Sequence, residues 1–123
     1  MEYKRVVVTG LGAITPVGNS VYAFWDNLLK GTSGSKLITR FDTSLFRTKF
    51  ACEIKDYHPD NFFDKKDLKK LDAFGQYAFI AAEEAIKDAG LMDVPSLDKK
   101  RVGVLFTSGF GGIQTFEQEL SQY

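Results

Sequence analysis

The chain has 123 residues, 44% of them hydrophobic and 14% aromatic, so it can bury one core and is not expected to be disordered. Sixteen basic and sixteen acidic residues cancel in charge, which argues against general nucleic-acid binding. No apolar run approaches the roughly 20 residues of a membrane-spanning helix, and the first apolar run is too short for a signal-peptide core. The single cysteine, Cys52, allows no internal disulfide and suits a reducing compartment. We therefore expect a cytoplasmic protein that binds neither nucleic acid nor membrane.

Two predicted strands each lead into a glycine-rich loop. Residues 5–9 (RVVVT) precede a loop at residues 10–18, and residues 101–107 (RVGVLFT) precede a loop at residues 108–112. A continuous β-branched run such as the first is typical of a strand covered on both faces in an α/β protein. Glycine at a strand end indicates a tight turn or a group brought close to the backbone. The fold class indicated is α/β.

A helix is predicted over about residues 21–30. Asn19 and Ser20 are good N-cap residues, and Gly31 is a good C′ residue. Apolar residues recur at the spacing of one helical face, which predicts a stripe that faces a core. The stripe consists of Val21, Phe24, Trp25, Leu28 and Leu29.

Residues 31–48 are rich in turn formers, and residues 49–55 alternate between two sets of side chains. The alternation predicts a half-exposed strand near a sheet edge. It places Cys52 on the same face as Phe50 and Ile54, and no helix N-terminus follows that would activate its thiol. We therefore interpret Cys52 as a packed structural cysteine.

Residues 59–71 are predicted to form short helical turns, followed by a longer helix over about residues 72–88 that Gly90 ends. Small and apolar residues in the longer helix predict a narrow seam for close packing on a sheet or another helix. The seam consists of Leu71, Phe74, Ala78, Ala81, Ala85 and Ala89. A last helix begins after Gly112, and its apolar stripe continues to Tyr123 without a C-cap, so we expect the chain to be truncated.

The first glycine-rich loop invites comparison with a dinucleotide-binding fingerprint. That fingerprint needs a third glycine so that a helix N-terminus reaches the pyrophosphate. Thr15 occupies the third position, Pro16 follows it, and the helix begins only near residue 20. Neither loop is followed by the Gly-Lys-Ser/Thr of a phosphate-binding loop. A structural turn is therefore favoured, and a nucleotide-binding module is kept as a less favoured alternative.

The chain offers no evident catalytic or metal-binding cluster. His58 is the only histidine, and residues 58–60 (HPD) resemble a J-domain signature. A J-domain needs a helical hairpin around that motif, whereas an alternating strand precedes it here, so we interpret it as a turn. One cysteine and one histidine on different elements do not form a catalytic dyad. No spacing indicates metal ligands or a carboxylate pair, and neither a metal nor a cofactor is expected.

A basic cluster precedes the long helix. In a helix, Lys66, Lys69 and Lys70 would share one face, and Leu68 and Leu71 would point the other way and dock it. Nearby aspartates weaken the positive field without removing it. The cluster is either an ordinary solvated face or a docking patch for an acidic partner, and composition alone favours the solvated face.

Phe110 lies between glycines in the loop at residues 108–112. A large aromatic side chain in such a setting either fills a core or lines a pocket. Spacing alone favours the core.

Several motifs together resemble one enzyme family. The run VVVTGLGAITPVGNS, at residues 6–20, looks like the N-terminus of the β-ketoacyl–acyl-carrier-protein synthases, the condensing enzymes of fatty acid synthesis. The nearest subgroup is the KAS II type, and the match spans essentially all 123 residues. The other landmarks follow in the family's order and are Trp25, ITRFDT at residues 38–43, KDLKKLDAF at residues 66–74, and SGFGG at residues 108–112.

This resemblance implies a thiolase-like fold, in which two similar α/β halves pack as an αβαβα sandwich, usually in a homodimer. Residues 1–123 would be the N-terminal portion of the first half, with the remainder of the enzyme absent. The family elongates acyl chains by decarboxylative Claisen condensation with malonyl-acyl carrier protein, using one cysteine and two histidines. Those catalytic positions come later in the family's chain, and Cys52 does not match the nucleophile motif. The resemblance therefore implies an acyltransferase without a cofactor, and no activity in these 123 residues alone.

Two sites carry over from the resemblance. Lys66, Lys69 and Lys70 match the basic positions near which the family docks acidic acyl carrier protein. Phe110 matches a position that lines the acyl pocket near the dimer interface. The family often has a smaller residue there, so a narrower pocket and shorter acyl primers are expected. Some relatives keep the fold without the active cysteine, and a non-catalytic chain-length-determining subunit is the alternative function.

Overall fold

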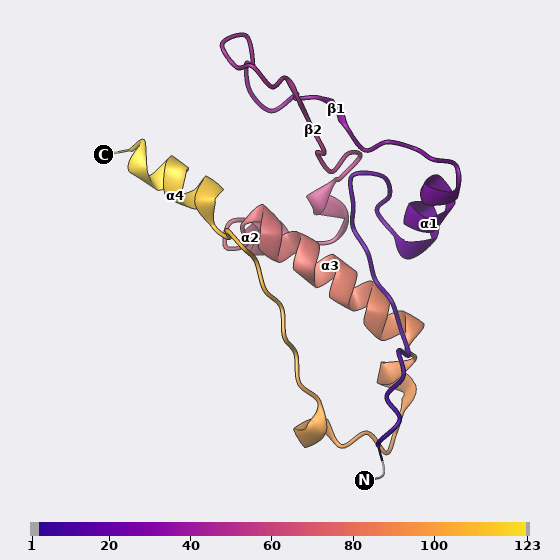
Figure 1. Cartoon of the computed structure of the whole chain (residues 1–123). Coiled ribbons are helices and arrows are strands. Elements are labelled where there is room, and N and C mark those ends of the chain that lie inside the picture. Colours follow the sequence, from indigo (N-terminus) through magenta and orange to yellow (C-terminus); the bar gives the residue numbers. More distant parts are fainter. Residues whose placement is uncertain (1–2, 123) are drawn as a thin grey trace. The chain divides into compact units, whose positions relative to one another are not determined.

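The computed structural model describes residues 3–122, which divide into two compact units (Figure 1). Unit 2 is Ala13–His58, and unit 1 consists of the described residues on either side of it in the sequence. The elements of unit 2 are α1 (Val21–Leu29), β1 (Lys36–Leu37) and β2 (Phe50–Ala51). Those of unit 1 are the helices α2 (Lys65–Leu68), α3 (Ala73–Asp88) and α4 (Ile113–Leu120) and the 3₁₀ helices η1 (Pro59–Asn61), η2 (Leu91–Asp93) and η3 (Lys99–Arg101).

The boundaries of α3, the longest helix of unit 1, follow from its sequence. The Asp72 carboxylate accepts a hydrogen bond from the Ala73 amide at 2.6 Å and so caps the first turn. Gly90 adopts a left-handed conformation with φ 58°, which side chains disfavour, and the helix ends before it. Within α3, Ile80 is buried at 7% exposure. The predicted helix over residues 72–88 and its glycine stop are confirmed.

The small residues of α3 allow the N-terminal segment of unit 1 to approach its backbone. A Cβ atom on Gly12 would collide with the main chain of Ala81, and one on Gly10 would lie 2.8 Å from the Ala89 Cβ atom. The predicted close packing along the alanine seam is therefore confirmed, but its predicted partner, a sheet or another helix, is not. Its partner is a glycine-containing segment, so these two glycines have a packing role that needs no bound phosphate.

The two predicted buried strands are not strands in this structure. Residues 5–9 and 102–107 form no strand, and η3 includes the start of the second predicted strand. A strand needs a neighbour to pair with its amide and carbonyl groups, and within the described residues neither segment has one. Val6 and Leu105 are consequently 91% and 90% exposed. The prediction that both segments are covered on both faces is wrong for this structure.

In unit 2, α1 confirms the predicted helix and its caps. The Ser20 hydroxyl accepts a hydrogen bond from the Ala23 amide at 3.2 Å, and Gly31 follows the helix with φ 66°. Before the helix, Thr15 and Gly18 exchange two backbone hydrogen bonds, at 2.9 and 3.2 Å. The interpretation of this part of the first glycine-rich loop as a structural turn is confirmed.

The apolar stripe of α1 does not face a core. Phe24 is half-buried, but Trp25 and Leu29 are 59% and 71% exposed, and no residue of α1 is fully buried. A helical stripe is buried only when another element covers it. The prediction of a core-facing stripe is therefore wrong for the described part of the chain.

The strands β1 and β2 form one short antiparallel pair, with Lys36 opposite Ala51 and Leu37 opposite Phe50. The strand predicted over residues 49–55 is thus reduced to two residues, and its partner lies in a segment predicted to be all turns. Cys52 follows the end of β2 and is exposed. The prediction of a packed cysteine is wrong, because the ladder ends before Cys52 and strand alternation no longer decides its environment.

The predicted short helical turns and the last helix are both present. The helices η1 and α2 fall within residues 59–71, and α4 begins after Gly112. Ser121 is the C-cap of α4, so the expected absence of a cap is wrong, while Tyr123 lies outside the described residues. The combination of helices and one strand pair is a mixed α/β structure, in which no described helix is long and apolar enough to cross a membrane.

Candidate functional site

The basic segment at α2 is organised by its N-cap. The Asp64 carboxylate accepts hydrogen bonds from the amides of Lys66 and Asp67, at 2.9 and 2.8 Å. The amide of Lys70 then donates to the Asp67 carbonyl at 2.9 Å and closes the next turn. Asp64 is therefore engaged with the backbone, and the lysines follow one another through a single compact turn.

Lys66, Lys69 and Lys70 are all exposed, whereas Leu68 and Leu71 are half-buried, as the helical pattern predicts. The first lysine lies in α2, the second is its C-cap, and the third lies in the following turn. Within the described part of the chain, none of the three forms an ion pair. Their positive charges are therefore available to a partner in solvent.

Asp72 joins the beginnings of α3 and α4. Its Oδ1 atom caps α3, and its Oδ2 atom accepts hydrogen bonds from the Thr115 amide at 3.2 Å and the Thr115 hydroxyl at 2.9 Å. Burial raises the pKa of Asp72, but the hydrogen bonds from Thr115 and Ala73 outweigh it and hold that pKa below its ordinary value of 3.8. A full negative charge therefore lies at two helix N-termini, where the helix dipoles favour it.

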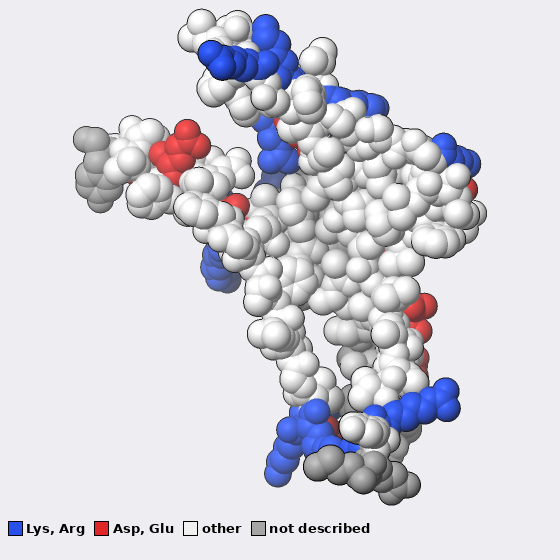
Figure 2. All heavy atoms as spheres, in the orientation of Figure 1, with Lys and Arg blue, Asp and Glu red and all other residues white. Residues whose placement is uncertain are grey.

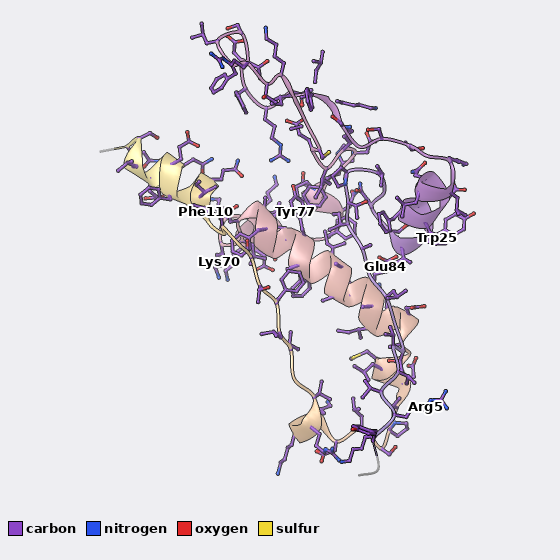
Figure 3. All side chains as sticks on the ribbon, viewed as in Figure 1. Arg5, Trp25, Lys70, Tyr77, Glu84 and Phe110 are labelled. Atoms are coloured by element: carbon purple, nitrogen blue, oxygen red, sulfur yellow. The ribbon has the colours of Figure 1, made fainter. Side chains whose placement is uncertain are left out.

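The loop at residues 108–112 lies against the first turn of α3. A Cβ atom on Gly111 would be 2.9 Å from the Phe74 ring, so Gly111 lies close against that side chain. Phe110 is 77% exposed, and Figure 3 shows it at the same end of α3 as Lys70. The expectation from spacing alone, that Phe110 fills a core, is wrong for this structure. The structure thus brings the predicted docking lysines and Phe110 to one end of α3.

Unit 2 contains a polar pocket of about 270 Å³ that the sequence did not predict. Its lining includes the turn at residues 15–19, together with side chains of α1 and of the β1–β2 region. The Asn27 amide group donates a hydrogen bond to the Val17 carbonyl at 2.5 Å, and the Lys55 ammonium donates to the Gly34 carbonyl at 3.0 Å. These side chains hold backbone segments of unit 2 together, which assigns the pocket a structural role.

The two residues weighed as catalytic candidates lie in irregular segments. Cys52 and His58 are both exposed, and His58 immediately precedes η1, in agreement with a turn. Among residues 3–122, no group of three or more His, Cys, Asp and Glu side chains is placed to hold a metal ion.

Figure 2 shows where basic side chains gather on the surface. In unit 2 they lie on the hairpin that connects β1 and β2. In unit 1 a second basic group, separate from the α2 lysines, consists of the exposed residues of η3. Sequence reasoning did not weigh this group, which is Lys99, Lys100 and Arg101.

Residues 3–123 match the family described as "Beta-ketoacyl synthase, N-terminal domain". The chain belongs to this β-ketoacyl synthase family. The chain is 46% identical, over 116 residues, to 3-oxoacyl-[acyl-carrier-protein] synthase 2 of Staphylococcus aureus. This match covers 94% of this chain and 28% of the relative. The chain is 43% identical, over 119 residues, to the Synechocystis protein of the same name, covering 97% of this chain and 28% of the relative. The predicted resemblance to the KAS II type is confirmed.

A solved structure supports the same family at the level of the fold. The chain superposes on the ishigamide ketosynthase/chain length factor with a TM-score of 0.68 and 34% identity. The superposition covers 94% of this chain and 30% of that chain. The likeness agrees with a thiolase-like α/β fold. The chain spans about 28% of the length of the curated relatives it matches. The docking role of the lysines and the pocket role of Phe110 stay predictions.

Proposed function

We propose that these residues form the N-terminal portion of the first half of a 3-oxoacyl-acyl-carrier-protein synthase. The observation that carries this proposal is the family match over residues 3–123, together with 46% identity to a named synthase of this kind. A protein of the relatives' length that contains this chain is called the full-length synthase below. In it, residues 5–9 and 102–107 take their place as strands of the αβαβα sandwich, which is supported by their apolar and unpaired state here.

The proposed reaction of the full-length synthase is a decarboxylative Claisen condensation. The malonyl thioester on the carrier loses carbon dioxide, and the carbanion that remains attacks the acyl thioester held on an enzyme cysteine. The carbon–sulfur bond to that cysteine breaks, so the thiolate leaves and the acyl chain is two carbons longer. The required cysteine and two histidines are placed outside these residues. The 123-residue chain is therefore expected to form no 3-ketoacyl product, and product from it would overturn this assignment.

Within this function, Lys66, Lys69 and Lys70 dock the acidic acyl carrier protein. The support is that all three are exposed and that no ion pair to them is found within the described residues. Three unpaired ammonium groups on one short turn create a local positive field that attracts and orients an acidic partner. Reversing their charge tests this role, because it should impair carrier-bound substrates and spare small thioesters.

Phe110 is proposed to line the acyl pocket and to shorten it. Its exposure of 77% leaves the ring free to form a wall with residues from elsewhere in the full-length synthase. A bulky aromatic ring excludes volume that a smaller side chain would leave to the acyl chain. Replacement of Phe110 by alanine should therefore extend the range of accepted primers.

The second candidate function is a non-catalytic chain-length-determining subunit. It is favoured by the likeness to the ishigamide ketosynthase/chain length factor at 34% identity. The two functions differ in the active cysteine, which lies outside these residues in either case. Condensing activity of the full-length synthase on its own separates them.

The remaining features of the proposal concern the setting of the enzyme. The full-length synthase is proposed to be a cytoplasmic homodimer, supported by its membership of the family. Nucleotide binding is not proposed, since Gly10 and Gly12 already have a role in packing against α3.

A further inference from the structure

One carboxylate serves the N-termini of two helices in unit 1. The N-cap position of α4 is Gly112, which has no side chain to accept a hydrogen bond from the first turn. Thr115 is the third residue of α4, and its amide is the donor that an N-cap side chain normally satisfies. Asp72 Oδ2 accepts from that amide at 3.2 Å, across 43 residues of sequence. Asp72 therefore caps α3 from within its own segment and α4 from outside it.

The same interaction fixes the path of the loop before α4. The Thr115 hydroxyl adds a second hydrogen bond to Asp72 Oδ2 at 2.9 Å, so the first turn of α4 is tied to the first turn of α3. In the loop before α4, Gly111 lies close to the Phe74 ring, which would be 2.9 Å from a Cβ atom at this position. Phe110 is the residue immediately before Gly111 in this loop. Its position thus depends on two contacts with the beginning of α3.

We propose that Asp72 and Thr115 are positioning residues that set the depth of the acyl pocket by fixing the loop that carries Phe110. This inference rests on the proposed function, in which Phe110 lines that pocket. The hydrogen bonds between Asp72 and Thr115 are called the link below. With the link intact, the Phe110 ring keeps one position, in which it occupies the volume that a long acyl chain would need. When the link is lost, the loop becomes more mobile, and the ring can move aside for longer chains. The link acts through Phe110 and takes no part in the chemical steps.

The test is Thr115→Val in the full-length synthase, with Thr115→Ser as the matched control. Valine keeps the branched shape and removes the hydroxyl, whereas serine retains the hydroxyl and its hydrogen bond to Asp72. Thr115→Val should lower the ratio of kcat/KM for short over long primers by about threefold to tenfold, the effect of one ordinary hydrogen bond, since this one is exposed to solvent. Thr115→Ser should keep the ratio of the parent enzyme.

A double variant separates the link from the proposed function. In a Phe110→Ala background, Thr115→Val should change the ratio no further, because the ring it positions is gone. If Phe110→Ala shifts the ratio but Thr115→Val does not, the link has no positioning role and the pocket role of Phe110 stands. If Phe110→Ala leaves the ratio unchanged, the pocket role itself fails. Should Thr115→Val not fold, Asp72→Asn tests the same link, since it keeps one oxygen for the α3 cap and replaces the acceptor of Thr115 with a donor.

Discussion

Reversal of the α2 charges gives a quantitative test of carrier docking. The change is Lys66→Glu, Lys69→Glu and Lys70→Glu together in the full-length synthase. An exposed ion pair contributes about 0.2–1 kcal/mol, and reversal both removes each attraction and adds a repulsion. With three exposed and unpaired lysines, a total of about 1–3 kcal/mol is expected, which is roughly a 5-fold to 150-fold loss in kcat/KM for carrier-bound substrates. Small thioesters, which need no protein docking, should react as before.

The matched control is a second triple reversal in the same unit. Lys99→Glu, Lys100→Glu and Arg101→Glu change the net charge equally, and these residues of η3 are also exposed. The assay is kcat/KM for carrier-bound and for small thioesters, measured at low and at physiological salt, since the screening length falls from about 30 Å at about 0.01 M to about 8 Å at about 0.15 M. The α2 effect should weaken as salt rises. Equal losses on both kinds of substrate, or equal losses in both triple variants, would show that the α2 lysines do not dock the carrier.

Two further predictions concern unit 1. Phe110→Ala should extend the accepted primer length in the full-length synthase, measured as the chain-length profile of kcat/KM, and an unchanged profile would refute the narrowing role. Asp72→Ala should lower the free energy of unfolding by about 1–2 kcal/mol at neutral pH, measured by denaturant unfolding, because the caps of both α3 and α4 are lost. The folded-state pKa of Asp72 lies below its ordinary 3.8, so its stabilisation is complete above pH 3.8 and is lost as the pH falls below that value. The difference in the free energy of unfolding between parent and variant should therefore become smaller below pH 3.8. A difference that does not change with pH would exclude a role for the carboxylate charge.

Local features of the fold could be predicted from the sequence. Ser20 and Gly31 delimit α1, and Gly90 ends α3, because capping and left-handed turns depend on single residue types. The close packing of the alanine seam of α3 could be predicted from helical periodicity, although its partner is an irregular segment and not the predicted sheet or helix.

Features that depend on distant partners could not be predicted. The apolar runs at residues 5–9 and 102–107 have strand-like sequences, but a strand forms only where another strand pairs with it. The hydrogen bond between Asp72 and Thr115 joins residues 43 positions apart, and no local sequence pattern predicts it. The environment of Cys52 was wrongly predicted for a related reason, since alternation holds only as far as the ladder extends. Each of these features therefore depends on a contact between residues that are distant in the sequence.

The most direct test of the account is the formation of 3-ketoacyl product from acyl- and malonyl-loaded carrier protein. The full-length synthase on its own should form product, and the 123-residue chain should form none. Product from the 123-residue chain would contradict the placement of the catalytic cysteine and histidines outside these residues. No product from a folded full-length protein that binds the loaded carrier would contradict the synthase assignment and favour the chain-length-determining subunit.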